Sequence, residues 1–161
     1  MNFRDKILTA ETLPAWREAL RAEGRVLAVT NGCFDILHVG HVNYLQSARA
    51  EADALLVGLN SDRSVRELKG DDRPIHTEAD RAAVVAALEA VDGVFIFDEP
   101  RATNFLKTAA PDVYIKGGNY SVEELPAEER AVVEATGGRI LVLGHVPGKS
   151  SSDIARRILE G

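Results

Sequence analysis

Two histidines three residues apart, His38 and His41, follow a short apolar run and open a stretch with helical character. Imidazoles at this spacing lie on one side of a helix start, where both rings can reach the same ligand. Gly40 between them leaves room for a ligand close to the backbone. The amino terminus of a helix also carries a partial positive charge that favours phosphate. We interpret the pair as a catalytic, phosphate-binding site; the structural alternative is a satisfied, partly buried histidine beside a helix-entry glycine.

The same turn contains a thiol and a carboxylate, Cys33 and Asp35. Cys33, His38 and His41 are residue types that bind zinc, and a catalytic zinc needs only three protein ligands. A structural zinc would need a fourth ligand, for which the sequence offers no clear partner. Asp35 could orient a histidine, help to hold a metal or make local hydrogen bonds in the turn. A zinc centre therefore stays open as an alternative.

Two groups of basic residues lie beyond the next apolar run. Lys69 precedes a glycine in a stretch that we expect to be a mobile loop, and Arg73 follows closely. Arg81 lies three residues before Val84 and so continues the apolar stripe of a helix predicted over 78–91. A charge at such a position needs a partner or a phosphate group. An internal ion pair is therefore the alternative for Arg81.

The turn Lys116-Gly117-Gly118-Asn119-Tyr120 directly follows another apolar run. Two successive glycines allow backbone groups to come close to a base or a sugar. A lysine at the end of a predicted strand adds a positive charge. The turn is therefore a candidate binding element, although a pair of glycines also occurs in ordinary turns.

Three serines, Ser150, Ser151 and Ser152, open the last predicted helix. Their hydroxyl groups and the free amides of a helix start form an anion site, or the serines merely cap the helix. The preceding stretch, with Gly144 and Gly148, imitates a P-loop. Three residues separate these glycines where a P-loop has four, so we reject that interpretation.

Alternation of short apolar runs with helical stretches predicts an α/β fold, a single domain with a five-stranded parallel sheet. The predicted strands cover residues 26–30, 54–59, 94–97, 113–115 and 140–143. The predicted helices cover residues 12–21, 42–52, 78–91, 102–109, 127–135 and 150–159. We expect a core over 25–161 and an amino-terminal helical extension over 1–22. Ligands of such sheets bind outside the carboxyl ends of the strands.

The composition narrows the class further. The chain has 161 residues, 45% of them hydrophobic, enough for a packed core. Its net charge of −6 argues against binding nucleic acid. Neither a signal peptide nor an apolar run of membrane-spanning length is present, so we expect a cytoplasmic protein. A single cysteine, Cys33, excludes an internal disulfide.

The segment from Asn31 to His41, with His38-Val39-Gly40-His41 at its end, resembles the signature of the cytidylyltransferase-like nucleotidyltransferases. Other segments are similar to the bacterial heptose 1-phosphate adenylyltransferases; they are Asn60-Ser61-Asp62, Leu68-Lys69-Gly70, Arg73-Pro74, Asp80-Arg81, Leu88 to Asp92 and Lys116 to Tyr120. Ser151 and Ser152 stand where this family has threonines. Gly118 stands where glycerol phosphate cytidylyltransferases usually carry an acidic residue, which favours the heptose branch.

The resemblance implies a Rossmann-like, doubly wound fold and assigns the site residues. The implied catalytic residues are His38, His41 and Lys69. Nucleotide contacts are implied for Asn31, Gly32, Cys33, Phe34, Asp35, Gly40, Arg81, Lys116, Gly117, Gly118, Ser150, Ser151 and Ser152, and substrate contacts for Arg73, Asn119 and Tyr120. It also implies ATP with Mg²⁺ as the donor, a sugar 1-phosphate as the acceptor, and a homodimer.

The expected reaction transfers AMP from ATP to a heptose 1-phosphate and releases pyrophosphate, giving an ADP-heptose for surface polysaccharide. An acceptor phosphate oxygen attacks the α-phosphorus in line, and positioning with charge stabilisation supplies most of the rate. Two alternatives stay open. One is a cytidylyltransferase acting on glycerol 3-phosphate or a related polyol phosphate, and the other is a non-catalytic nucleotide-binding regulator.

Overall fold

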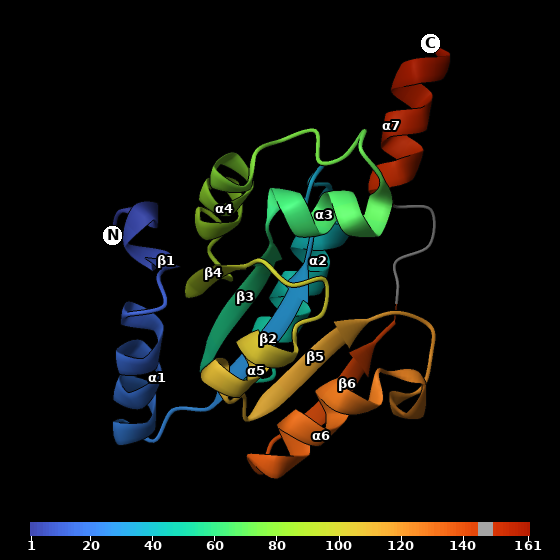
Figure 1. Ribbon diagram of the computed structural model, residues 1–161. Helices are drawn as coiled ribbons and strands as arrows, with labels where there is room; N and C mark the ends of the chain where they lie inside the picture. Colours follow the sequence, from blue (N-terminus) through green and yellow to red (C-terminus); the bar gives the residue numbers. More distant parts are fainter. Residues whose placement is uncertain (145–149) are drawn as a thin grey trace.

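A parallel sheet forms the centre of the fold (Figure 1). The computed structural model describes residues 1–144 and 150–161, and in these ranges the sheet has six strands in the order β1-β4-β3-β2-β5-β6. The strands are β1 (Ile7–Leu8), β2 (Leu27–Gly32), β3 (Ala54–Asn60), β4 (Gly93–Phe97), β5 (Val113–Gly117) and β6 (Arg139–Leu143). The helices are α1 (Thr12–Ala22), α2 (Val39–Arg49), α3 (Asp62–Lys69), α4 (Glu78–Ala86), α5 (Thr103–Ala109), α6 (Ala127–Ala135) and α7 (Ser151–Glu160), with 3-10 turns η1 (Phe3–Lys6) and η2 (Val122–Glu124).

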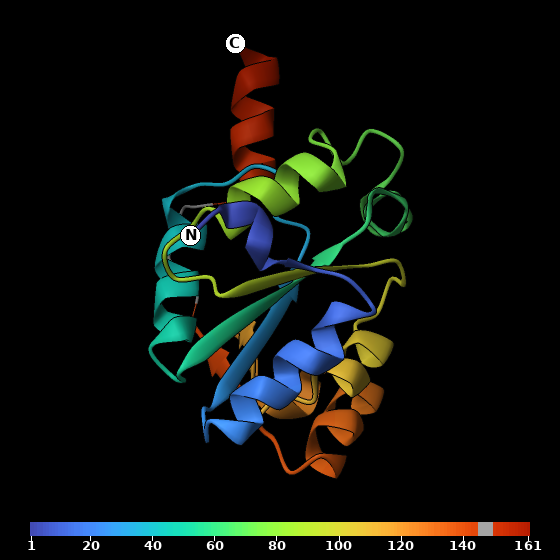
Figure 2. The same cartoon turned by 90° about the vertical axis from the view of Figure 1, so that its left-hand side faces the viewer.

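Helices cover both faces of the sheet, which confirms the doubly wound α/β class. Buried side chains of α1, α5 and α6 pack on one face, and those of α2 and α4 pack on the other. Figure 2 shows α2 on one side of the strands and α5 with α6 on the opposite side. Every residue of β3 is buried, as expected for a strand at the centre of a two-sided parallel sheet.

The direction of winding changes at β2. The chain adds β3 and then β4 on one side of β2, whereas β5 and then β6 lie on its other side. The carboxyl ends of β2 and β5 therefore form the switch point at which ligands of open α/β sheets bind. The histidine pair lies at the start of α2, which follows β2, and the Lys116–Tyr120 segment covers the end of β5 and the turn after it.

The predicted sheet was one strand short. The missed strand β1 is only two residues long and pairs with β4 at Ile7–Val94 and Leu8–Phe95. Two residues are too few to show a period in the sequence. The amino-terminal segment thus adds a strand to the sheet in addition to the predicted helix.

Two further predictions, a loop at Lys69 and the end of a helix, were also wrong. Lys69 is the last residue of α3 and not part of a mobile loop. Ser61 caps this helix by accepting a hydrogen bond from Ser64 N, and Gly70 ends it with a φ of 101°. Only one apolar side chain of α3, Val65, is buried, which left little periodicity to detect. The helix predicted over 78–91 ends earlier, at Ala86.

The end of the chain differs from the rest of the fold. Helix α7 has no buried residue and extends away from the sheet (Figure 1). The P-loop-like stretch that we rejected includes Gly148 and Lys149, which lie outside the described residues. Among the helices of the described ranges, none has the length and apolar character needed to cross a membrane.

The centre of the sheet yields a stability prediction at Gly58. A Cβ atom there would collide with the ring of Phe105, which itself stacks on Phe95 and Phe97 at 5.6 and 5.4 Å between ring centroids. We expect Gly58→Ala to lower the free energy of unfolding by about 1–3 kcal/mol, as overpacking of a core does. Urea denaturation measures this, and an unchanged midpoint would contradict the packing described.

Candidate active site

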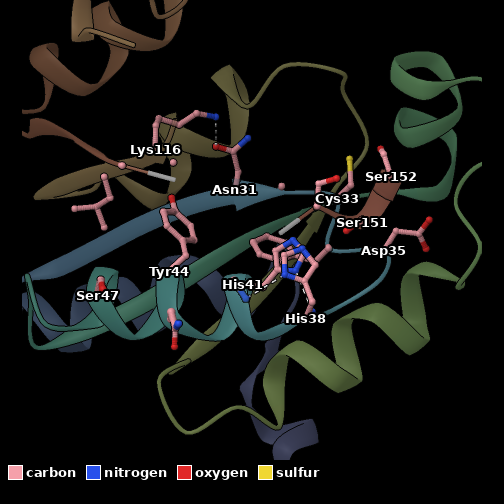
Figure 3. Close-up of a pocket in the computed structure, with 18 of the residues that line it drawn as sticks. Asn31, Cys33, Asp35, His38, His41, Tyr44, Ser47, Lys116, Ser151 and Ser152 are labelled. Atoms are coloured by element: carbon pink, nitrogen blue, oxygen red, sulfur yellow. Dashed lines mark hydrogen bonds between the residues drawn. The ribbon is translucent and has the colours of Figure 1, made fainter. Parts of the chain in front are cut away.

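A cavity of about 420 Å³ opens at the carboxyl ends of β2 and β5 (Figure 3). Its wall comes from the turn after β2, one face of α2, the end of α3, the turn after β5 and the start of α7. It brings together most of the predicted site residues, namely Asn31, Gly32, Cys33, Phe34, Asp35, His38, Gly40, His41, Lys69, Lys116, Gly117, Tyr120, Ser150, Ser151 and Ser152. Segments far apart in the sequence thus meet in one space.

Four predicted residues, Arg73, Arg81, Gly118 and Asn119, are not among the described residues that line the cavity. Five lining residues were missed in the sequence, namely Asn43, Tyr44, Ser47, Leu143 and Gly144. The first three follow Gly40 by three, four and seven positions and so share one face of α2. That helical spacing was the signal available for finding them.

The two histidines cap α2 reciprocally. His38 is the N-cap residue, and its Nδ1 atom accepts a hydrogen bond of 3.1 Å from Gly40 N. Nδ1 of His41 accepts one of 3.3 Å from His38 N. The ring centroids are 4.0 Å apart. Because Nδ1 is the acceptor in each ring, the neutral imidazoles carry their proton on Nε2, and each Nε2–H is a donor.

His41 is neutral at physiological pH. Burial lowers the pKa of His41 to about 4, and the neighbouring His38 and Lys69 act in the same direction. The imidazole therefore acts on an anion as a hydrogen-bond donor and not as a cation. The spacing of the histidines alone could not distinguish a cationic imidazole from a neutral donor.

The positive charge of the cavity comes from lysines. Lys69 reaches it from the exposed end of α3, and Lys116 from β5. Lys116 Nζ donates a 3.2 Å hydrogen bond to Asn31 Oδ1. Burial lowers the pKa of Lys116, while the charge of Glu129 acts in the opposite direction. The two lysines thus come from different elements, α3 and β5.

The wall formed by α2 is fixed by Tyr44. Its hydroxyl group donates to the Ile115 carbonyl at 3.2 Å and shares a 2.7 Å hydrogen bond with Thr30 Oγ1. Burial raises the pKa of Tyr44 to about 12. A Cβ at Gly117 would lie 3.0 Å from the Tyr44 ring, so glycine allows the ring to pack directly on β5.

At the start of α7, one of the three serines, Ser150, has the predicted capping role. Ser150 Oγ accepts a hydrogen bond of 3.0 Å from Asp153 N, and Ser151 Oγ donates one of 2.9 Å to the Ile36 carbonyl. The second bond ties α7 to the turn that contains the histidines. Anion binding by these serines remains a prediction.

Among the described residues, the hydrogen bonds of Asp35 go to the segment between α3 and α4 and not to a histidine side chain. The buried Asp35 carboxylate accepts hydrogen bonds from Arg73 Nε at 2.7 Å and from the backbone amides of Ile75 and His76 at 2.9 Å each. Burial raises the pKa of Asp35, but these hydrogen bonds outweigh it and the pKa lies below its ordinary value. Asp35 therefore anchors the segment between α3 and α4.

Arg81 forms the internal ion pair that was the alternative for it. The guanidinium group contacts Asp62 at 2.8 Å and donates to the carbonyl groups of Cys33 at 2.6 Å and Asn60 at 2.9 Å. It is buried as predicted, but for another reason, since Val84 is 52% exposed and the buried stripe of α4 runs through Ala82, Val85 and Ala86. Arg81 joins the ends of β2 and β3 beneath the cavity.

The zinc alternative finds no support in the described ranges. They contain no group of three or more His, Cys, Asp or Glu side chains that could hold a metal ion. Burial raises the pKa of the Cys33 thiol, which disfavours the thiolate that zinc binds. Nδ1 of both histidines is occupied by a backbone amide.

A family model described as Cytidylyltransferase-like matches residues 29–157, and the chain belongs to this family. The resemblance predicted from the segment between Asn31 and His41 is thereby confirmed.

Similar proteins cover nearly the whole chain. It is 49% identical over 156 residues to "Bifunctional protein HldE" of Geotalea uraniireducens, which is 97% of this chain and 31% of that protein. A protein of the same name from Campylobacter fetus is 47% identical over 159 residues, 98% of this chain and 32% of that protein. The chain thus spans about a third of the length of these curated relatives.

Two solved structures are similar in fold. A lipopolysaccharide core biosynthesis protein from Thermoplasma volcanium has a TM-score of 0.62 and 26% identity, with 76% of this chain and 98% of that chain covered. A pantoate-beta-alanine ligase from Francisella tularensis has a TM-score of 0.58 and 15% identity, with 96% of this chain and 78% of that chain covered. The second likeness concerns the fold alone.

The Asp35 anchor makes a prediction about stability and pH. Replacing Asp35 with Asn leaves Arg73 without its charge partner, and we expect a loss of about 3 kcal/mol in the free energy of unfolding at neutral pH. Because folding lowers the pKa of Asp35, its contribution is present above the unfolded-state pKa and is lost as the pH falls through and below about 4. The variant should lack this part of the acid dependence.

Asp71, an exposed residue of the same segment, supplies the matched control. Asp71→Asn should leave both the unfolding free energy and its acid dependence near those of the parent protein. Urea unfolding at a series of pH values measures both quantities. Equal unfolding free energies for the Asp35→Asn and Asp71→Asn variants would show that the anchor is not stabilising.

Proposed function

We propose that the protein transfers AMP from ATP to a heptose 1-phosphate and releases pyrophosphate. The observation that carries this proposal is the pair of adjacent imidazoles that present Nε2–H donors at a helix start, in a cavity with Lys69 and Lys116. Family membership supports nucleotidyl transfer. Two observations support the heptose acceptor. The segments from Leu68 to Tyr120 resemble those of heptose 1-phosphate adenylyltransferases, and the chain is 47–49% identical to the HldE relatives.

The reaction balances without a proton transfer. An oxygen of the acceptor phosphate forms a bond to the α-phosphorus as the bond to the bridging oxygen of the β-phosphate breaks. Charge builds up on the oxygens around the α-phosphorus and on the departing pyrophosphate. Donors already in place for that charge lower the barrier, because they need no reorganisation during the reaction.

We assign the donors by their position. The Nε2–H groups of His38 and His41 stabilise the oxygens around the α-phosphorus, since they lie together at the partly positive end of α2. The ammonium groups of Lys69 and Lys116 neutralise phosphate charge. Ser150, Ser151 and Ser152 bind the triphosphate at the start of α7, and the Gly117–Tyr120 turn contacts the base or the sugar.

Nucleotidyltransferases of this kind generally use ATP with a divalent metal ion, which we propose to be Mg²⁺. The described residues offer no cluster of ligands for a resident ion. The ion would therefore arrive on the oxygens of the triphosphate, and the protein would supply the remaining positive charge. The expected homodimer and cytoplasmic location are part of the same proposal.

An assay of pyrophosphate release tests the donor and the acceptor together. The purified protein is given ATP or CTP with Mg²⁺, and heptose 1-phosphate or glycerol 3-phosphate. With heptose 1-phosphate as the acceptor, we expect turnover with ATP to be at least about tenfold faster than turnover with CTP, a difference of about 1.4 kcal/mol. Better turnover of CTP with glycerol 3-phosphate would favour a cytidylyltransferase, and nucleotide binding without turnover a regulator.

The role of His41 can be tested with two amides. Gln places its amide nitrogen near the position of Nε2, whereas Asn places it near that of Nδ1. We expect His41→Ala to lower kcat about a hundredfold or more, as loss of an oxyanion donor does. His41→Gln should recover part of this loss and His41→Asn less. Steady-state kinetics measures the difference, with circular dichroism as a control for folding.

The pH dependence gives a second test of the same group. Because the pKa of His41 is lowered to about 4, the neutral donor is present throughout the range from pH 5 to 7. Protonation of His41 should therefore cause no change of kcat in this range. An acid limb near pH 6.5 that disappears in the His41→Gln variant would contradict a neutral donor.

A further inference from the structure

A buried carboxylate lies outside the cavity. Glu129 on α6 is 5% exposed, and it is not among the described lining residues. None of the ion pairs between described residues includes it. A carboxylate without an oppositely charged partner is costly to bury, so the place of Glu129 in the fold needs an explanation.

Glu129 Oε1 accepts a 3.3 Å hydrogen bond from Ala102 N at the start of α5, and its other oxygen leads to the cavity. Its Oε2 atom lies 3.1 Å from the hydroxyl group of Tyr114, which is also 2.7 Å from Asn31 Oδ1. The same Asn31 oxygen accepts the 3.2 Å hydrogen bond from Lys116 Nζ, drawn as a dashed line in Figure 3. A continuous path of carboxylate, hydroxyl, amide and ammonium groups therefore links α6 to the wall of the cavity.

Tyr114 cannot satisfy both acceptors at once. Its hydroxyl group has one proton, and both the Asn31 amide oxygen and the Glu129 carboxylate accept it. The Lys116 ammonium has three N–H donors, of which the described part of the chain engages one through Asn31. The remaining donors are available to an anion in the cavity.

We propose that Glu129 is a positioning residue, which acts through Tyr114 and Asn31 to keep the Lys116 ammonium charged and directed into the cavity. The anion that Lys116 meets there, a phosphate group of either substrate, rests on the proposed function. The charge and orientation of Lys116 do not rest on the proposed function, because they follow from groups of the chain itself.

Electrostatics supports this role. The titratable groups that face Lys116 are Glu129 from α6, Tyr114 from β5 and Cys33 from the turn after β2. Burial lowers the pKa of Lys116, and the negative charge of Glu129 is the largest effect that raises it. Without that charge, the lysine would lose its proton at a lower pH.

The test uses Glu129→Gln, which removes the charge and keeps the shape. Glu128→Gln is the matched control, because Glu128 is the exposed neighbour on the same helix. The chain has five lysines, so their ¹³C signals after reductive methylation are few enough to assign with Lys116→Arg. We expect the Lys116 titration midpoint to fall by about one pH unit or more in Glu129→Gln and to stay unchanged in Glu128→Gln.

Turnover supplies the second readout. Glu129→Gln should lower kcat/KM about tenfold or more, with the alkaline limb of the pH profile moved to lower pH by the same shift as the Lys116 midpoint. Tyr114→Phe keeps the charge of Glu129 but removes the link to Asn31, so kcat/KM should fall while the Lys116 midpoint moves less. If Glu129→Gln does not fold, Tyr114→Phe still tests whether the link from Glu129 to Asn31 positions Lys116.

Several results would overturn the proposal. One is an equal Lys116 midpoint in the parent, Glu129→Gln and Glu128→Gln proteins. Another is a wild-type kcat/KM for Tyr114→Phe. A lower melting temperature for Glu129→Gln with an unmoved midpoint and pH profile would show a merely structural glutamate. If the parent protein turned over no substrate pair, the proposed function would fail, while the titration would still decide the role of Glu129.

Discussion

Because β5 pairs with β2 on the side opposite β3, the carboxyl ends of β2 and β5 meet where the winding of the sheet reverses. The helix that follows β2 packs on one face of the sheet, and the helix between β5 and β6 packs on the other. The cavity lies at these strand ends. This one constraint sets the histidines of α2 opposite Lys116 of β5, although 75 or more residues separate them in the chain.

The cations of this region divide between scaffold and cavity. Arg73 is ion-paired with Asp35. Arg81 is ion-paired with Asp62 and also donates to carbonyl groups at strand ends, because its planar guanidinium group can satisfy several acceptors at once. Lys69 and Lys116 have few partners among the described residues and line the cavity. Arginines thus hold the turns around the site in place, whereas lysines leave donors available for a ligand.

Local features of the site could be predicted from the sequence, and distant ones could not. The histidine pair and the turn after β5 are contiguous in sequence and directly follow apolar runs, so their place at strand ends could be predicted. The charged partners of Asp35 and Arg81 lie 38 and 19 residues away, and no local period marks them. Glu129 was missed for the same reason, because on α6 it reads as one more charge of a solvated helix.

In the fold, too, some elements could be predicted from the sequence and others could not. The strand β3 was predicted because seven successive buried residues leave a continuous apolar run. The strand β1 has two residues and α3 has one buried apolar side chain, so neither leaves a period in the sequence. Both nevertheless matter to the site, since α3 sets the position of Lys69.

The cap of α2 connects the stability of the helix to the chemistry of the site. Nδ1 of His41 accepts the hydrogen bond from His38 N, and it can do so only without a proton. Protonating His41 would place two N–H donors face to face and leave a backbone amide at the helix start without its acceptor. The cap therefore opposes a positive charge on this ring, as burial does. The same contacts that begin the helix keep the imidazole in the state in which Nε2 donates and the ring carries no charge.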